Sequence, residues 1–337
     1  MYNCHGHIFD FHCVPEKFIP ILSKRMLDDK KSLEIWVKVL HHAIPWTDTD
    51  KLDKFAKFIS TMGKSQEEIY LNWASQYPKG TRLNALTMDL RWMGAGFVQK
   101  DYIDQLKEAL EVKKKHKSMM LSVMIDPRAH DLDELYRFYY DNHAYIDALK
   151  MYPLVGYTVI DNRLDRFYEL CDLFGWPVIV HGTPENAVHC KNRKEVKRTM
   201  PRGFSGYKKS RRLKVMCGNY AHPYHIIQAA KAHPNINFNI AHFHGGWRKE
   251  IINGMIECDN LYSDISFTFR NKSSQEMLIE LVAKFPILMD RLLFGDDMYM
   301  ILTEDEENEF VDIKDIVGDD IFHALSVVNP ERFFNMK

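Results

Sequence analysis

Short apolar runs alternate with amphipathic stretches along most of the chain. Each run has the length of one buried strand, and they lie at residues 2–8, 83–90, 118–126, 147–153, 177–182, 236–242, 261–267 and 291–297. A closed parallel barrel requires eight strands. Stretches between the runs have helical spacing, as in 100–116, and 165–175 ends in a glycine of the kind that terminates helices. Strands that alternate with helices indicate a parallel sheet, so the pattern predicts an α/β fold, the (β/α)8 TIM barrel.

Two connections are too long to be plain barrel loops. Residues 12–80 follow the first predicted strand, and residues 183–222 follow the fifth. Both insertions start at the C-terminal end of a strand, which is the end where barrel enzymes place their active sites. A barrel of about 250 residues with these insertions accounts for the chain length, so we expect one domain over residues 1–337.

The second insertion is strongly basic. A solvated lid is the simpler interpretation of such a run of charge, and recruitment of an anionic substrate or a partner is the alternative. Its basic residues are Lys191, Arg193, Lys194, Lys197, Arg198, Arg202, Lys208, Lys209, Arg211, Arg212 and Lys214, against two glutamates, Glu185 and Glu195.

The overall charge is balanced, with 45 Lys and Arg against 46 Asp and Glu, which argues against nucleic acid or an anionic membrane as a partner. No apolar run reaches the roughly 20 residues of a membrane span, and no signal peptide precedes the first histidines. Six cysteines are scattered without a C-x-x-C pair. We therefore predict reduced thiols in a cytoplasmic protein.

Histidines and other polar residues recur where predicted strands end. His5 and His7 are two residues apart, so on a strand both imidazoles face the same side and can approach one ion. Chance is the competing explanation for a single H-x-H pair in a chain with 16 histidines. A polar residue at the C-terminal end of a barrel strand is typical of catalysis. Four such residues end the fourth, fifth, sixth and eighth predicted strands, namely Lys150, His181, His242 and Asp297.

The segments that carry these residues resemble the amidohydrolase superfamily. They are similar to its amidohydrolase-2 branch, which contains aminocarboxymuconate-semialdehyde decarboxylase and related metal-dependent enzymes. The similar segments occur in the family's order, and they are YNCHGHIF, ALKMYPLVGY, WPVIVHGTPENA, FNIAHFHGGW, LYSDISF, DRLLFGDDMYM and NPERFF.

The resemblance implies a role for each residue. His5, His7, His181 and Asp297 become metal ligands, and Asp297 is also the proton shuttle. His242 becomes a second-metal ligand or a catalytic histidine. The ion implied is divalent, with zinc favoured and one ion preferred over two. Lys150 either bridges two metals as a carboxylated lysine or stays unmodified and pairs with a substrate carboxylate.

This chain departs from the family's motifs at two positions. Asn3 stands where the family usually has aspartate, so the orientation of the neighbouring ligands must differ. The usual F-G-T-D motif of the eighth strand is FGDD here, which favours Asp297 as the ligand but leaves Asp296 as an alternative.

The implied function is hydrolysis of a small carbonyl compound, such as an amide, lactone or ester, by a metal-activated water. Non-oxidative decarboxylation of a small carboxylic acid uses the same ligands and is the alternative. A catalytically silent barrel that binds a metabolite or partner through the basic insertion is the third hypothesis. Arg82, Arg91 and Arg163 are candidate clamps for a substrate carboxylate. The sequence is compatible with a homo-oligomer and does not fix the oligomeric state.

Overall fold

A computed structural model describes residues 1–16, 64–184, 193–200, 204–243, 246–267, 269, 272–299 and 309–336. Its strands form one sheet in which every pairing is parallel, in the order β8-β7-β6-β5-β4-β3-β2-β1-β9. The strands are β1 (Tyr2–His7), β2 (Arg82–Leu86), β3 (Met119–Met124), β4 (Ala148–Met151), β5 (Val178–Val180), β6 (Phe238–Ile240), β7 (Leu261–Asp264), β8 (Leu292–Leu293) and β9 (Met298–Tyr299).

The eighth strand of the barrel is divided into two short pieces. β8 pairs with β7, and β9 pairs with β1, so the two pieces together join the last strand to the first. Between them, the Cys4 amide donates to the Phe294 carbonyl at 2.8 Å, and the Asp297 amide donates to the His5 carbonyl at 2.8 Å. The barrel is therefore nearly closed, and the predicted (β/α)8 fold is confirmed.

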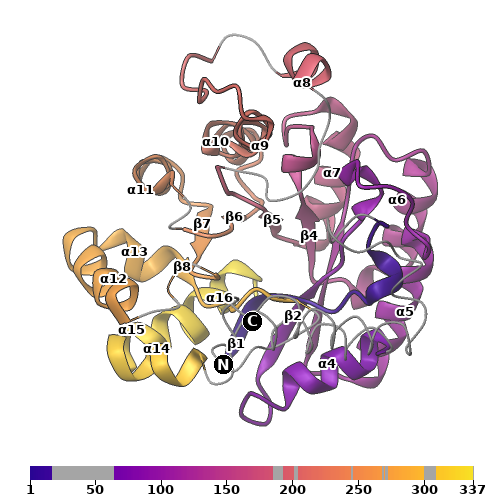
Figure 1. The fold of residues 1–337 in the computed structure, drawn as a ribbon. Coiled ribbons are helices and arrows are strands. Elements are labelled where there is room, and N and C mark those ends of the chain that lie inside the picture. The colour runs from indigo at the N-terminus through magenta and orange to yellow at the C-terminus, as the bar shows by residue number, and fades with distance from the viewer. Residues whose placement is uncertain are drawn as a thin grey trace, which may run out of the picture.

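Helices cover the outside of the sheet (Figure 1). The predicted helix at 100–116 is α5, and that at 165–175 is α7, which ends at Gly175 with a left-handed φ of 71°. The described helices are α4 (Gln66–Ala74), α5 (Tyr102–Lys115), α6 (Leu132–Asp141), α7 (Asp165–Phe174), α8 (Arg193–Thr199), α9 (Leu213–Gly218), α10 (Pro223–Ala232), α11 (Arg248–Glu257), α12 (Lys272–Lys284), α13 (Ile287–Arg291), α14 (Glu309–Val317), α15 (Asp319–His323) and α16 (Asn329–Phe333). Short 3-10 turns lie at Phe11–Cys13, Leu90–Met93, His143–Tyr145, Pro153–Val155, Asn162–Leu164 and Asn219–Ala221, and a π-helical turn lies at Ala324–Val328.

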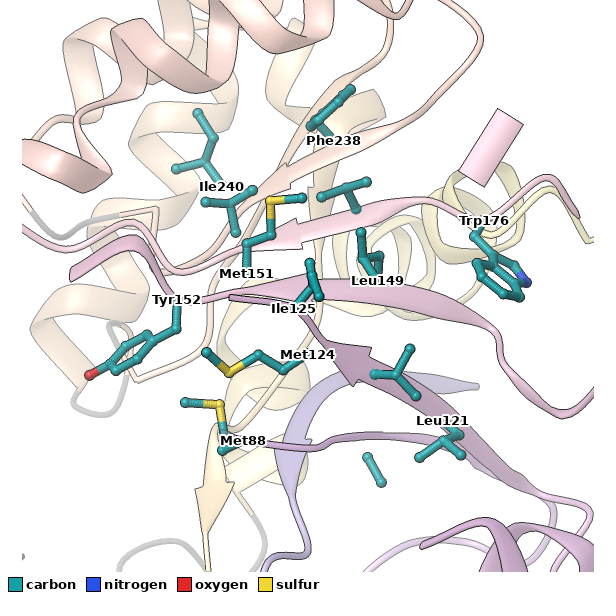
Figure 2. Packing of buried hydrophobic residues seen from close by; sticks show 14 of the residues in the cluster. Met88, Leu121, Met124, Ile125, Leu149, Met151, Tyr152, Trp176, Phe238 and Ile240 are labelled. Atoms are coloured by element: carbon teal, nitrogen blue, oxygen red, sulfur yellow. The ribbon is translucent and has the colours of Figure 1, made fainter. Parts of the chain in front are cut away.

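Side chains alternate between the two faces of each strand, as the pleat of a strand requires. In β4, Leu149 and Met151 face outward and pack with Ile125, Phe238 and other apolar residues beneath the helices (Figure 2). Ala148 belongs to a separate, inner cluster. Lys150 is two residues from Ala148 and therefore lies on the same face of the strand. Its side chain points into the barrel, next to the inner apolar layer.

The insertions are described only in part. Residues 17–63 of the first predicted insertion and residues 185–192 and 201–203 of the second lie outside the described residues. In the described part of the second insertion, Lys197, Arg198, Arg211 and Arg212 are exposed, which agrees with a solvated surface. None of the described helices combines the length and the hydropathy that a bilayer crossing requires.

The prediction of reduced cysteines is wrong at Cys217. Cys4, Cys13, Cys171 and Cys258 are free and buried. Cys217, in α9, is disulfide-bonded. Scattered spacing in the sequence does not reveal this bond, because a disulfide depends on which cysteines the fold brings together.

Candidate metal centre

His5, His7 and Asp297 converge at the C-terminal end of the barrel. The Nε2 atoms of His5 and His7 each lie 3.4 Å from Oδ1 of Asp297. The His5 ring is fully buried, and the Asp297 side chain is 16% exposed. The three residues come from the first and eighth strands, which meet where the barrel closes.

An irregularity in β1 aims both histidines into the barrel. The register of β1 against β2 shifts between Asn3 and Gly6. Cys4 packs in the inner apolar cluster, yet the adjacent His5 also points inward, which a regular strand does not allow. Gly6 faces the other way, and a Cβ there would lie 2.4 Å from the ring of Trp73, so only glycine allows this close approach.

The second nitrogen of each of these histidines is held by an acceptor. His7 Nδ1 lies 3.0 Å from the Leu86 carbonyl oxygen, so this nitrogen carries the proton. His5 Nδ1 lies 3.0 Å from Oδ2 of Asp264. Both Nε2 atoms therefore face the Asp297 carboxylate. Burial first, and then the charge of Lys150, lowers the pKa of His5 to about 4, so the ring is neutral at pH 7.

Lys150 lies directly beside this group. Its Nζ is 3.4 Å from Nε2 of His5, and the residue is fully buried in β4. Burial lowers the pKa of Lys150 to about 8, while the carboxylates of Asp264 and Asp297 oppose the shift. The lysine is therefore close to the boundary between ammonium and free amine at neutral pH.

His181 and His242 form a pair on the neighbouring strand ends. His242 Nε2 lies 3.2 Å from His181 Nδ1, and His181 Nε2 lies 3.1 Å from the hydroxyl of Thr183. His242 Nδ1 lies 3.1 Å from the Ser266 carbonyl, so that nitrogen is a donor and Nε2 an acceptor. The His5 and His242 rings are 5.1 Å apart, which joins this pair to the first group.

Asp264, at the end of β7, is a residue that sequence reasoning missed. Its carboxylate accepts from His5, from the His242 amide at 3.1 Å and from Asn239 at 2.6 Å. Burial opposes ionisation, but His5 and the other surrounding groups lower the pKa of Asp264 well below its usual value. A partial signal was available, because this aspartate is a charged residue inside the predicted strand at 261–267, but it lies in the middle of that run and the structure ends the strand there.

The two adjacent aspartates of the eighth strand point to different surroundings. Asp296 accepts hydrogen bonds from Trp73 at 2.8 Å and Tyr77 at 2.7 Å, and burial raises its pKa. Asn3 donates to Tyr77 at 2.9 Å in the same cluster. A second carboxylate at position 3 would face the Asp296 carboxylate in a buried environment, which accounts for asparagine there. Of the two aspartates, Asp297 is the one beside His5 and His7.

Strained backbone surrounds these side chains. His242, Phe267 and Asp297 have φ angles of 65°, 62° and 55°, in the left-handed region that residues with side chains seldom adopt. Phe267 is also 53% exposed, and its ring lies 6.4 Å from that of His242. Such strain persists where the surrounding structure enforces it, and it is concentrated at functional sites.

The arginines considered as carboxylate clamps have other roles. Arg82 begins β2, at the opposite end of the barrel, and its guanidinium lies over the ring of Tyr2, so this hypothesis is wrong. Arg91 pairs with Asp89 at 2.8 Å, and Arg163 pairs with Asp161 at 2.7 Å. Each of the last two is already engaged by a carboxylate two residues before it.

The donor set fits a divalent metal ion. In the described part of the chain, ligand atoms of His5, His242 and Asp297 lie within 4.8 Å of one another. The neutral imidazole of His5 directs a nitrogen lone pair at a carboxylate oxygen of Asp297, and a cation placed between the two removes their repulsion. Imidazole and carboxylate are also common ligands of Zn²⁺.

Comparisons with known proteins agree on the fold. The chain matches the family model described as "Amidohydrolase" over residues 4–336. An uncharacterized TIM-barrel protein from Bordetella bronchiseptica has 19% identity and a TM-score of 0.54, with 80% of this chain and 82% of that chain covered. 4-Oxalomesaconate hydratase from Rhodopseudomonas palustris has 11% identity and a TM-score of 0.52, with 99% of this chain and 95% of that chain covered. A putative amidohydrolase from Staphylococcus aureus has 12% identity and a TM-score of 0.53, with 84% of this chain and 96% of that chain covered. No curated protein matched the chain.

Proposed function

Since this chain belongs to the amidohydrolase family, we propose that it is a metal-dependent enzyme that hydrolyses a small carbonyl compound, such as an amide, lactone or ester. The observation that carries the proposal is the convergence of His5 Nε2 and His7 Nε2 on Asp297 Oδ1, at 3.4 Å each. His181 is the fourth ligand that we assign, and His242 lies close enough to contribute.

A divalent ion held by these residues would polarise a substrate oxygen and lower the pKa of a water molecule, which is the chemistry that hydrolysis needs. Asp297 is the proton carrier, because it is an ionised carboxylate at the partly exposed rim of the group. The imidazole of His242 faces the same space and is suited to orient the substrate carbonyl.

Lys150 favours decarboxylation of a small carboxylic acid as the second candidate. An unmodified ammonium group beside His5 would pair with a substrate carboxylate and would suit a single metal. Carboxylation by CO2 would instead turn the lysine into an anionic ligand that bridges two metals and would support hydrolysis. We favour one ion, zinc, and an unmodified lysine, because one metal-bound water is sufficient for hydrolysis and the lysine then stays available to a substrate carboxylate.

Metal analysis tests the proposal directly. Protein prepared without chelators should contain about one divalent ion per chain, and His5→Ala, His7→Ala and His181→Ala should each lose most of it while keeping the barrel's circular dichroism. His116→Ala is the matched control, because that histidine pairs with Glu67 on the surface. A full metal complement in any of the three variants would remove that residue from the ligand set.

Two further measurements separate the candidate reactions. Incubation with a panel of esters, lactones and amides reports hydrolysis, and incubation with small carboxylic acids, followed by a bicarbonate assay, reports decarboxylation. Two ions per chain, with added density on Lys150 in a crystal structure, would favour hydrolysis. A wild-type protein without bound metal would favour the silent barrel.

A further inference from the structure

Tyr152 follows β4 directly and belongs to the same apolar cluster as Met151, the last residue of that strand. Its ring packs edge-on against His181, with centroids 4.7 Å apart and an interplanar angle of 88°. In Figure 2 the ring extends away from the packed side chains of Ile125 and Met151, with the hydroxyl at its far end. The phenol therefore stands at the rim of the candidate metal centre.

The Tyr152 hydroxyl differs from those of the other buried tyrosines. Seven of the nine buried tyrosines in the described chain bond their hydroxyls to protein atoms: Tyr70, Tyr102, Tyr139, Tyr157, Tyr168, Tyr220 and Tyr262. Tyr152 is only 8% exposed, yet its hydroxyl bonds to no described residue and is not among the fully enclosed polar atoms. The small exposed part of this residue therefore includes the hydroxyl. Tyr2, the ninth buried tyrosine, begins β1 at the N-terminal end of the barrel, opposite the candidate metal centre.

Hydrogen bonds hold the backbone of Tyr152 in place. Its backbone amide donates to the Tyr157 hydroxyl at 2.8 Å, and that hydroxyl donates to the Ile125 carbonyl at 2.9 Å. A rigid phenol that stays protonated is a hydrogen-bond donor that needs little reorganisation.

We propose that Tyr152 contacts the substrate directly and donates a hydrogen bond from its hydroxyl to a carbonyl or carboxylate oxygen of the compound bound beside His181 and Asp297. This role rests on the proposed function. A buried tyrosine usually finds a partner for its hydroxyl, and here the hydroxyl has none among the described residues while its ring packs on His181. The assignment makes Tyr152 a determinant of substrate affinity that contributes nothing to metal binding.

Acetohydroxamate is a suitable probe, because it presents a carbonyl oxygen to a metal site. Isothermal titration of the probe into metal-loaded wild-type protein and Tyr152→Phe should give a dissociation constant about tenfold weaker for the variant, the size expected for the loss of one hydrogen bond. Metal content and unfolding midpoint should stay at wild-type values, since phenylalanine keeps the ring that packs on His181.

Tyr168→Phe is the matched control. That hydroxyl bonds to the Val159 carbonyl at 2.6 Å, so its loss should lower stability slightly and leave probe affinity unchanged. Equal affinity in wild type and Tyr152→Phe, or no binding by any metal-loaded protein, would overturn the role of Tyr152. Absence of metal from the wild-type protein would instead overturn the proposed function, and this role with it.

Discussion

At the C-terminal end of the barrel the strands finish in ionisable side chains, whereas the N-terminal end is filled with apolar ones. At the C-terminal end, His5 lies within hydrogen-bonding reach of both Lys150 and Asp264. At the N-terminal end, Phe333 of α16 and the adjacent Phe334 pack with Tyr2 in the inner cluster. Phe333 is fully buried and lies 5.3 Å from the ring of Tyr262.

The contrast between the two ends indicates that one stabilises the fold and the other carries the candidate chemistry. The apolar end lowers the free energy of the fold by removing aromatic surface from water. The polar end holds buried charges, unprotonated nitrogens and left-handed backbone, each of which costs free energy unless a ligand compensates for it. Changes at the two ends should therefore affect different measurements.

The largest expected effect is at Asp297. Asp297→Asn keeps an oxygen ligand but removes the group that accepts a proton, so kcat should fall by about 10²- to 10⁴-fold with little change in KM. The measurement uses whichever compound of the ester, lactone, amide and acid panel the wild type turns over. Asp296→Asn is the control, because that carboxylate is bound to Trp73 and Tyr77, and kcat should change far less. The reverse order of the two variants would assign the proton carrier to Asp296.

At the apolar end, Phe333→Ala should cost about 3–5 kcal/mol of unfolding free energy, because the ring leaves a cavity beside Tyr262 and Phe334. Urea denaturation checks this value. The metal content of the folded protein should stay at the wild-type level. Loss of metal from a folded Phe333→Ala protein would show that the two ends are coupled.

A smaller effect is expected at Asp264. Asp264→Asn removes the charge that orients His5 while leaving an acceptor, so metal affinity should fall by about 10- to 100-fold in competition with a chelator. Asp290→Asn, an exposed carboxylate paired with Arg332, is the control and should leave metal affinity unchanged. Unchanged affinity in Asp264→Asn would mean that other contacts alone orient His5.

Part of the candidate site could be predicted from sequence. Lys150, His181, His242 and Asp297 were selected because each lies at or near the end of an apolar run of strand length, and His5 because it lies two residues from His7 on such a run. Parallel strands in a closed barrel all finish at the same rim, so polar residues at those positions must come together. Their roles as ligands and catalytic groups remain predictions, as does the single-domain organisation.

The sequence by itself determined the strand order, the parallel barrel and the rim on which the polar residues gather, because hydrophobic periodicity and chain direction are local properties. Only the tertiary structure decided which partners those residues have. His5 meets Asp264 across 259 residues, and of two adjacent aspartates one turns to Trp73 and the other, at a φ of 55°, to His5. Hydrogen-bond partners of this kind depend on strand register, on a bulge in β1 and on barrel closure, which no local pattern encodes.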